Sequence, residues 1–201
     1  MKIVVYGATG MVGSQVVEAA VARGHEVTAV SRKGAEIPGT TAVAADLADT
    51  STVSKLAAGA DAVVFAIPTD RTGGPAQPTI DAHRAIIEAR PDARLLVVGG
   101  AGSLQVDGRL LVDAPGFPDA YKPESLAFTQ ILADYRASDG LDWTIVSPSP
   151  MIAPGERAGY VLGTDSPVGE SVTTTDFADA IVDELETPAY KGRRFTVASK
   201  S

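Results

Sequence analysis

The glycines near the start of the chain have the spacing that most clearly indicates a chemical role. Residues 7–13 read GATGMVG, a GxxGxxG pattern that follows a short apolar run and precedes a helical one. Glycines so spaced allow a tight turn, a close approach of backbone to a pyrophosphate, and close packing of helix on sheet. The alternative is a glycine turn that serves packing alone. The motif, with helix-start amides facing a diphosphate, predicts dinucleotide binding by Gly7, Thr9, Gly10, Met11, Val12 and Gly13.

The end of the next expected strand indicates which dinucleotide fits. An NAD site places an acid about 20 residues after the glycines, where it binds the ribose 2′-hydroxyl. Here that strand ends in Ser31 and Arg32, and a guanidinium is suited to a 2′-phosphate. We therefore expect NADP(H) in preference to NAD(H), with Glu36 close enough to keep NAD as an alternative. The other alternative for Arg32 is a solvated loop cation.

Two further strand ends are expected to line the same crevice. Asp46 and Leu47 follow the third expected strand, where they could flank an adenine ring. Ala66, Ile67 and Pro68 follow the fourth strand, beside the same crevice. Asp46 could equally cap the helix that comes next.

The composition narrows the chemistry open to a site. The chain has 201 residues and no Cys, which excludes thiolate nucleophiles, disulfides, zinc ribbons and iron–sulfur clusters. Of its two histidines, His25 is interpreted as structural and His83 as a helix-surface or core residue. We expect no metal site. The net charge of −8 argues against nucleic acid or an anionic membrane as the main partner, and no window approaches the roughly 20 apolar residues of a membrane span.

The elements that must position these residues follow from hydrophobic patterning. Short β-branched runs alternate with helical patterns, which is typical of βαβ units around a parallel sheet. Most of these runs are continuously apolar, as expected where helices cover both faces of the sheet. We predict strands at Lys2–Tyr6, Glu26–Ser31, Thr41–Ala45, Asp61–Ala66, Arg94–Val98, Asp142–Ser147 and Arg194–Ala198.

Three helices are also marked in the sequence. The first follows the glycine motif and ends near Arg23-Gly24. The middle one runs from Pro123, tolerated in a first turn, to about Ser138. The last starts at the cap residues Thr173 and Asp176. Its acidic run, Asp183–Glu186, is interpreted as a solvated face.

Two segments depart from the alternation of strands and helices. Arg71–Pro78 is a Gly/Pro loop, and Ser147–Glu170 has no sustained period. Both follow strands, so both should overhang the carboxyl edge of the sheet, where binding loops usually lie. We predict one α/β domain over residues 1–201, a doubly wound Rossmann domain with a mostly parallel sheet, helices on both faces and a substrate-side loop region at about 147–172. The first residues read as a strand and not as a secretory signal, so a cytoplasmic location is expected.

With these residues placed, essentially the whole chain resembles the atypical short-chain dehydrogenase/reductases of the NmrA-like and biliverdin-reductase-B-like group. Within that group it is similar to the candidate NADH-flavin reductases. The resemblance implies a Rossmann fold that binds NAD(P), with a flavin as substrate and not as a tightly bound cofactor. Beside GATGMVG it is carried by LLVVGGAGSL (Leu95–Leu104), LDWTIVSPSPMIAPGERAG (Leu141–Gly159), DFADAIVDELETP (Asp176–Pro188) and RRFTV (Arg193–Val197).

The resemblance also implies where catalytic residues would lie. The superfamily pairs a tyrosine with a lysine four residues later, which lowers the tyrosine pKa. Here Tyr121 is followed at that position by Ser125, and the adjacent Lys122 does not share its helix face. Tyr121 is therefore expected to hydrogen-bond a substrate or to pack at the core edge. Ser103 lies where superfamily serines line the nicotinamide pocket, unless Gly99–Gly102 is only a flexible turn.

Residues of the 147–172 loop resemble the family's substrate-side wall. Pro148 and Met151 belong to it, and Arg157 could meet an anionic group such as a flavin phosphate. The alternative for Arg157 is a surface pair with Glu156.

These patterns together favour hydride transfer from NADPH to a flavin or quinone-like small molecule. In such a step the cofactor carries the hydride, and the fold supplies distance and stacking. Two alternatives stay open: a non-catalytic NADP(H)-sensing protein of NmrA type, and a carbonyl or quinone reductase that uses Tyr121 as an acid. The protein is expected to act as a monomer or homodimer.

Overall fold

Eight strands form one twisted sheet in the computed structural model, which describes residues 1–200. Their order is β10-β12-β8-β5-β4-β1-β2-β3, and every neighbouring pair is parallel except β10 with β12. The strands are β1 Lys2–Tyr6, β2 Glu26–Ser31, β3 Thr40–Ala44, β4 Ala62–Phe65, β5 Arg94–Val98, β8 Trp143–Pro148, β10 Tyr160–Gly163 and β12 Arg193–Ser199.

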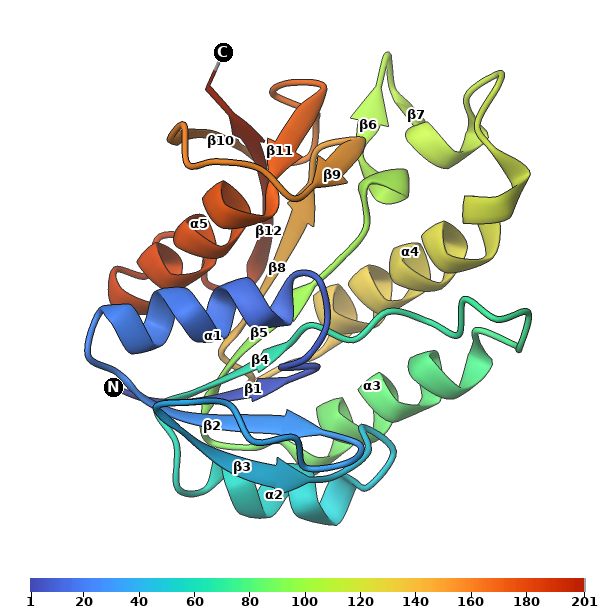
Figure 1. The fold of residues 1–201 in the computed structure, drawn as a ribbon. Helices are drawn as coiled ribbons and strands as arrows, with labels where there is room; N and C mark the ends of the chain where they lie inside the picture. Colours follow the sequence, from blue (N-terminus) through green and yellow to red (C-terminus); the bar gives the residue numbers. More distant parts are fainter. Residues whose placement is uncertain (201) are drawn as a thin grey trace.

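Within residues 1–200, five α-helices cover the two faces of this sheet (Figure 1). Two of them pack together on one face and three cover the other: α1 Gly13–Ala22 with α5 Thr174–Glu186, and α2 Thr50–Ala57, α3 Gln77–Ala89 and α4 Lys122–Ala137. Each face has its own hydrophobic cluster, with Phe177 in one and Phe65 in the other. The predicted doubly wound α/β fold with a mostly parallel sheet is therefore confirmed.

Short elements extend from the carboxyl ends of the strands (Figure 1). They are a parallel pair, β9 Met151–Ala153 with β11 Ser171–Thr173, a hairpin, β6 Gln105–Val106 with β7 Arg109–Leu110, and the 3₁₀ turns η1 Ala101–Ser103, η2 Leu111–Asp113 and η3 Asp119–Tyr121. The hairpin and the three turns connect β5 to α4, so both long connections of the chain lie on the side where the parallel strands end.

The strand predictions hold to within one residue at each end. β1, β2 and β5 have the predicted bounds, whereas β3 begins and ends one residue earlier, β4 is one residue shorter at each end, β8 is shifted by one residue, and β12 is one residue longer at each end. The segment 147–170, predicted to be irregular, contains β9 and β10. β10 is a four-residue antiparallel edge strand, YVLG, whose Val161 and Leu162 are exposed, so it differs from the buried parallel strands that the pattern was used to find.

The acidic run at the end of α5 is not uniformly solvated, so that prediction is wrong for Glu184. Its side chain is buried and its Oε1 accepts hydrogen bonds from buried Arg94 and from the amide of Tyr190 at 2.9 Å. Its Oε2 accepts from the amide of Ala189, also at 2.9 Å. Arg94 donates in addition to Asp142 at 2.7 Å. The periodicity could not show this, because the partner cation lies 90 residues away on β5.

Both histidines have the structural roles that were expected. His83 is buried, with its Nδ1 3.2 Å from the hydroxyl of Tyr135. Burial lowers the pKa of His83 to about 4, so it is neutral at pH 7 and cannot serve as an acid there. His25 lies with its Nε2 2.8 Å from Glu186. Trp143 is a core residue, as interpreted.

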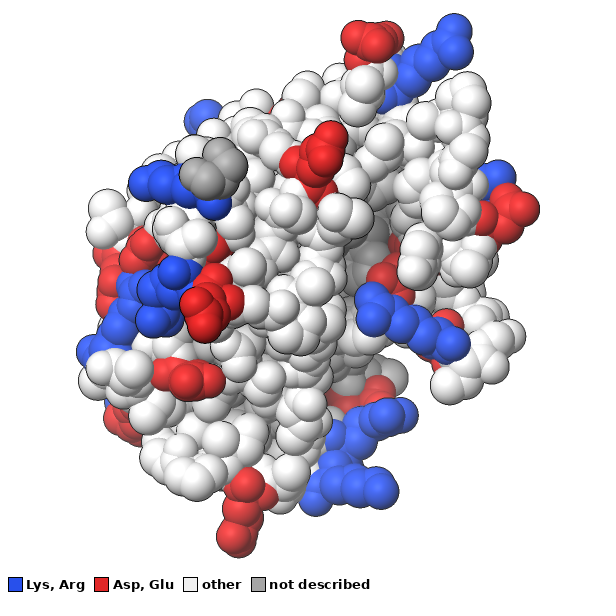
Figure 2. Space-filling view, turned by 45° about the horizontal axis from the view of Figure 1, so that its top comes forward, with Lys and Arg blue, Asp and Glu red and all other residues white. Residues whose placement is uncertain are grey.

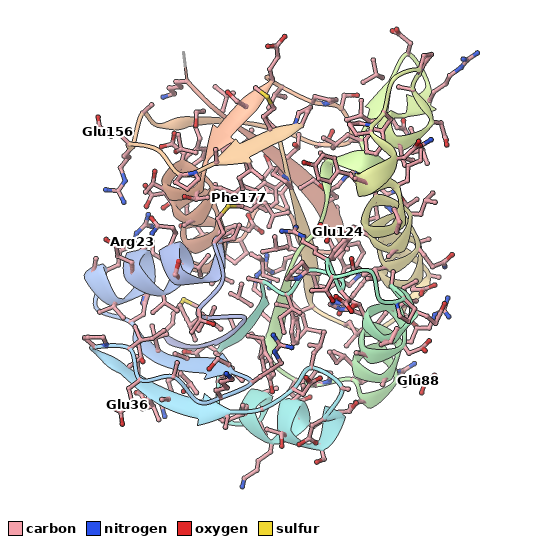
Figure 3. The ribbon with its side chains drawn as sticks, turned by 45° about the vertical axis from the view of Figure 1, so that its right-hand side comes forward. Arg23, Glu36, Glu88, Glu124, Glu156 and Phe177 are labelled. Atoms are coloured by element: carbon pink, nitrogen blue, oxygen red, sulfur yellow. The ribbon has the colours of Figure 1, made fainter. Side chains whose placement is uncertain are left out.

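Replacing Glu184 tests the buried ion pair. Glu184→Ala should lower the free energy of unfolding by about 3–5 kcal/mol, because it removes the buried carboxylate that pairs with Arg94 and accepts from two amides. Urea unfolding followed by circular dichroism measures this. Glu88→Ala, at an exposed position on α3 (Figure 3), is the control and should change the value by less than about 0.5 kcal/mol. Equal losses in the two variants would show that the pair does not stabilise the fold.

Candidate functional site

The strand order of the sheet reverses at β1, and this places a crevice at the carboxyl ends of β1 and β4. The two strands are adjacent and parallel, and the amide of Ala66 donates to the carbonyl of Tyr6 at 3.0 Å just beyond them. Ligands of doubly wound sheets bind at such a reversal point. Figure 2 brings this side forward and shows a hollow between two masses of the surface, with Lys and Arg side chains along part of its margin.

The three motif glycines have different roles in this crevice. Gly7 has φ +78°, and a side chain on it would overlap the carbonyl of Ala66. A side chain on Gly13 would overlap the carbonyl of Gly7. A Cβ on Gly10 would instead meet only the Gly7 carbonyl oxygen at 3.2 Å and the Ala66 oxygen at 4.0 Å. Gly7 and Gly13 therefore serve packing, whereas Gly10 is exposed and leaves the backbone open to a ligand.

The start of α1 offers unpaired hydrogen-bond donors beside Gly10. Val12 is the N-cap residue and gives no side-chain cap. Within residues 1–200, the amides of Thr9, Met11 and Val12 donate no hydrogen bond, whereas the Gly10 amide donates to Gly7 at 2.9 Å. A helix N-terminus whose donors are unsatisfied suits a phosphate group. These residues fit the diphosphate of a dinucleotide.

The end of β2 has the cation that the sequence indicated. Arg32 is exposed and makes no ion pair within residues 1–200. Ser31 accepts a hydrogen bond from the amide of Ala35 at 2.9 Å, which orders the loop that follows the strand. Figure 3 places Glu36 at the outer margin of the molecule on this side. Arg32 is thus free to meet a 2′-phosphate.

The two predicted cofactor residues after β3 differ in their exposure. Asp46 is exposed and accepts from the amide of Ala48 at 3.0 Å, whereas the side chain of Leu47 is buried. The cap of α2 is Asp49, which accepts from the amide of Thr52 at 3.1 Å, so the alternative of a capping Asp46 is wrong. The hydroxyls of Thr52 and Ser51 also donate to Asp49, at 2.6 and 2.7 Å, and these bonds together with that of the Thr52 amide lower the pKa of Asp49 to about 2.

The third group of predicted cofactor residues follows β4. Ala66 is buried beside Gly7, Ile67 is half-buried and Pro68 is exposed. The crevice is therefore bordered here mainly by backbone.

Ser125 occupies the position, four residues after Tyr121, where the superfamily has its lysine. Tyr121 is 65% exposed at the end of η3, so the alternative that it packs at the core edge is wrong. Ser125 is buried against η1, where a Cβ on Gly102 would come within 2.5 Å of the Ser125 hydroxyl oxygen. A lysine side chain has no room at that contact. Lys122 is paired with Asp119 at 2.7 Å instead.

Ser103 belongs to a buried polar cluster that the sequence did not indicate. Its hydroxyl oxygen accepts from Arg194 of β12 at 2.7 Å and lies 3.4 Å from the carbonyl of Gly100. Arg194 is itself buried and pairs with Asp165. Desolvation is the main cause that lowers the pKa of Arg194. The hydroxyl of Ser103 therefore anchors the η1 turn to the sheet. In the sequence its partner, Arg194, was noted only as part of the RRFTV block.

Of the predicted substrate wall, Met151 is 61% exposed on β9 and Pro148 is buried. Arg157 is not paired with Glu156. Its guanidinium donates to Asp179 of α5, with one bond of 3.2 Å, and Asp179 also pairs with Arg23. Figure 3 shows Glu156 and Arg23 on the same side of the molecule. Arg157 is thus held by Asp179 on α5, while its side chain remains 64% exposed.

Asp176 of α5 also binds the loop that contains Arg157. Thr173 caps α5 as expected, accepting from the Asp176 amide at 3.1 Å. The carboxylate of Asp176 is fully buried and accepts from the amide of Gly159 at 2.9 Å and the hydroxyl of Ser199 at 2.6 Å.

An ion pair on the margin of the crevice was missed from the sequence. Arg71 of the β4–α3 loop donates to Glu124 of α4 through Nη2 at 2.7 Å and Nε at 2.9 Å. Thr69 donates to the same carboxylate at 3.1 Å. Figure 3 shows Glu124 near the middle of the molecule, between the two groups of helices. No local pattern relates residues 53 positions apart.

Two further findings concern residues 1–200 as a whole. They contain no group of three or more His, Cys, Asp or Glu side chains that could hold a metal ion. None of their helices is both long and apolar enough to cross a membrane.

Known proteins are similar to this chain over its whole length. A protein-family model described as NAD(P)H-binding matches residues 7–188. YwnB, an uncharacterized protein of Bacillus subtilis, is 36% identical over 100% of both chains. The structure of a candidate exported protein from Burkholderia pseudomallei has 36% identity and a TM-score of 0.88, covering 98% of this chain and 99% of that one. A candidate NADH-flavin reductase from Streptococcus pneumoniae has 33% identity and a TM-score of 0.83 over 100% of both chains.

Substitution at Gly10 tests the phosphate site. Gly10→Val should weaken NADPH binding by about tenfold to a hundredfold, because the side chain displaces one charge-assisted contact of about 1.5–3 kcal/mol. The fold should survive, since a Cβ at Gly10 meets the Gly7 carbonyl oxygen at 3.2 Å, which needs a shift of only a few tenths of an ångström. Gly13→Val is the contrasting variant and should lower the melting temperature, because its side chain overlaps the Gly7 carbonyl. NADPH fluorescence titration and thermal unfolding measure the two effects. Unchanged affinity in folded Gly10→Val would remove the phosphate site from α1.

Proposed function

This chain belongs to the NAD(P)H-binding family, and on that basis we propose that it is an oxidoreductase that transfers hydride from NADPH to a flavin or similar planar acceptor. The observation that carries the proposal is the start of α1, where the amides of Thr9, Met11 and Val12 are unpaired beside the open Gly10. These donors can bind a diphosphate without any rearrangement of the helix, because no internal acceptor has to be displaced.

The choice of NADPH over NADH rests on Arg32. Its guanidinium is exposed beyond the end of β2 and makes no ion pair within residues 1–200. A guanidinium can form two parallel hydrogen bonds to a phosphate, and NADH has no phosphate at the ribose 2′ position. The hydrogen bond from the Ala35 amide to Ser31 orders the loop that carries Arg32, which supports its assignment to the adenosine end of the cofactor.

The proposed acceptor class rests on exposed side chains that follow the carboxyl ends of the strands. Met11, Met151 and Tyr121 are among the exposed large side chains on the connections after β1, β8 and β5. Flat apolar contact of this kind suits a ring system. The similarity to a protein named as a candidate NADH-flavin reductase supports the same class.

The residues present suit a reaction that needs little acid–base chemistry. When bound, the nicotinamide supplies the hydride. The protein's part is to hold the cofactor at α1, to place the acceptor against it, and to exclude water. Tyr121 can donate a hydrogen bond to the acceptor, but the lysine that would tune it is absent and Ser125 fills that position. A reduced flavin can take its proton later from water.

Cofactor selectivity gives one test of the proposal. Arg32→Ser should weaken NADPH binding by about tenfold to a hundredfold and leave NADH nearly unchanged, because the lost contacts are to the 2′-phosphate alone. Lys33→Ser removes the same charge from the next residue and should have a smaller effect on NADPH. Fluorescence titration with both cofactors measures the constants. Equal losses for NADPH and NADH in Arg32→Ser would contradict the preference for NADP.

Turnover with different acceptors gives the second test. NADPH oxidation should be supported by riboflavin or FMN better than by a small aldehyde. Tyr121→Phe should lower flavin reduction by about tenfold or less, the scale of one neutral hydrogen bond. A thousandfold fall, or a preference for the aldehyde, would indicate carbonyl reduction with Tyr121 as an acid. Tight NADPH binding without turnover of any acceptor would indicate a sensor.

A further inference from the structure

We infer that the acceptor end of the crevice selects uncharged ring systems over anionic ones, because Glu124 neutralises the arginine on its margin. The inference rests on the proposed function and narrows its substrate class. It concerns two facing segments: the β4–α3 loop, residues 68–76, and the entry to α4, residues 117–125. Together they are called the acceptor mouth below. Tyr121, the exposed candidate hydrogen-bond donor, belongs to the second of these segments.

The Arg71–Glu124 pair joins the two segments of the acceptor mouth. Both carboxylate oxygens of Glu124 are occupied, one by Nη2 of Arg71 at 2.7 Å and the other by Nε at 2.9 Å and by Thr69 at 3.1 Å. Thr69 is buried, so it fixes the carboxylate from the inner side. This two-point fork is the geometry in which a guanidinium binds a carboxylate most strongly. The positive charge of Arg71 is thereby compensated within the protein.

Each partner is held in place by its own element. Glu124 lies in the first turn of α4, where the positive end of the helix dipole stabilises a carboxylate. Arg71 follows Asp70, which accepts from both the amide and the hydroxyl of Thr72, at 2.7 and 2.6 Å, and so orders the loop. Arg71 is nonetheless 64% exposed, so a solute in the crevice can reach it.

The charges of the acceptor mouth leave no cation without a partner. Its two cations are Arg71 and Lys122, and its three carboxylates are Asp70, Asp119 and Glu124. Arg71 is paired with Glu124, and Lys122 with Asp119 at 2.7 Å. A dianionic phosphate brought here meets a net negative mouth. An uncharged ring meets no such repulsion.

The cations beyond the end of β2 are not paired in this way. Arg32 and Lys33 are exposed there and form no ion pair within residues 1–200. Arg32 nevertheless acts on the mouth: the pKa of Asp70 is lowered mainly by its hydrogen bonds from Thr72 and in smaller part by the charge of Arg32. Arg157, the other arginine expected to receive an anion, is held by Asp179. Arg32 and Lys33 thus differ from the two cations of the acceptor mouth, which are both paired with carboxylates. This difference makes Glu124 the residue that sets the charge preference.

Riboflavin and FMN provide the test, because they share one ring system and differ by a phosphate. Binding of each is measured by flavin fluorescence quenching on the protein saturated with NADP⁺, and kcat/KM of each is measured with NADPH. The wild type should favour riboflavin. Glu124→Gln should shift the riboflavin-to-FMN affinity ratio by about tenfold or more towards FMN, because Arg71 gains an uncompensated charge-assisted contact to phosphate. The double variant Arg71→Gln/Glu124→Gln should return the ratio to within about threefold of the wild type.

Asp113→Asn is the matched control, since it removes one exposed carboxylate that pairs with no cation in residues 1–200. It should leave the ratio unchanged. An equal shift in Asp113→Asn would mean that only the overall field matters, and a wild type that favours FMN would also overturn the inference. If both flavins bind and Glu124→Gln leaves the ratio unmoved, the inference fails while the proposed function stands. If neither flavin binds or turns over although NADPH binds, the flavin acceptor itself is wrong and the inference falls with it.

Discussion

The crowding of three backbone segments at the end of β1 is the constraint on which the site depends. A side chain at Gly7 would overlap the carbonyl of Ala66, and one at Gly13 would overlap the carbonyl of Gly7. The turn can therefore pass directly from the strand into α1, with no preceding residue in position to cap the helix. The first amides of an α-helix have no partner within the helix, and those of Thr9, Met11 and Val12 find none elsewhere in residues 1–200. Packing that serves the fold thus also presents the donors that suit a diphosphate.

Ion pairs with a buried arginine join other strands to the helix and turn that pack against them. Arg94 and Glu184 join β5 to α5, and Arg194 ties β12 to Ser103 of the η1 turn and to Asp165. The Arg194 contacts fix a connection that borders the crevice, whereas Arg94 and Glu184 lie where β5 begins, at the amino edge of the sheet. The exposed pair of Arg71 and Glu124 joins the β4–α3 loop to α4 on the crevice side.

Much of the fold could be predicted from the sequence, because continuous apolar runs and the glycine motif are local signals. β1, β2 and β5 had the predicted bounds, and Gly10 and Arg32 are exposed at the ends of β1 and β2. What was missed depends on pairs distant in sequence. The partners of Glu184 and Arg157, and the contact of Ser125 with Gly102, exist only once strands and helices are packed together. A local pattern marks a residue as charged or small, but the tertiary fold decides what it faces.

The central claim, that the cofactor diphosphate lies on the first amides of α1, can be tested directly by NMR. Addition of NADP⁺ to ¹⁵N-labelled protein should shift the amide resonances of Thr9, Met11 and Val12 most strongly, together with that of Arg32. Amides at the opposite, amino edge of the sheet, such as those of Gly24 and Gly59 in the open hollow there, should stay unchanged. Shifts that gather at that edge, or that leave residues 9–12 unmoved while the cofactor binds, would contradict the account.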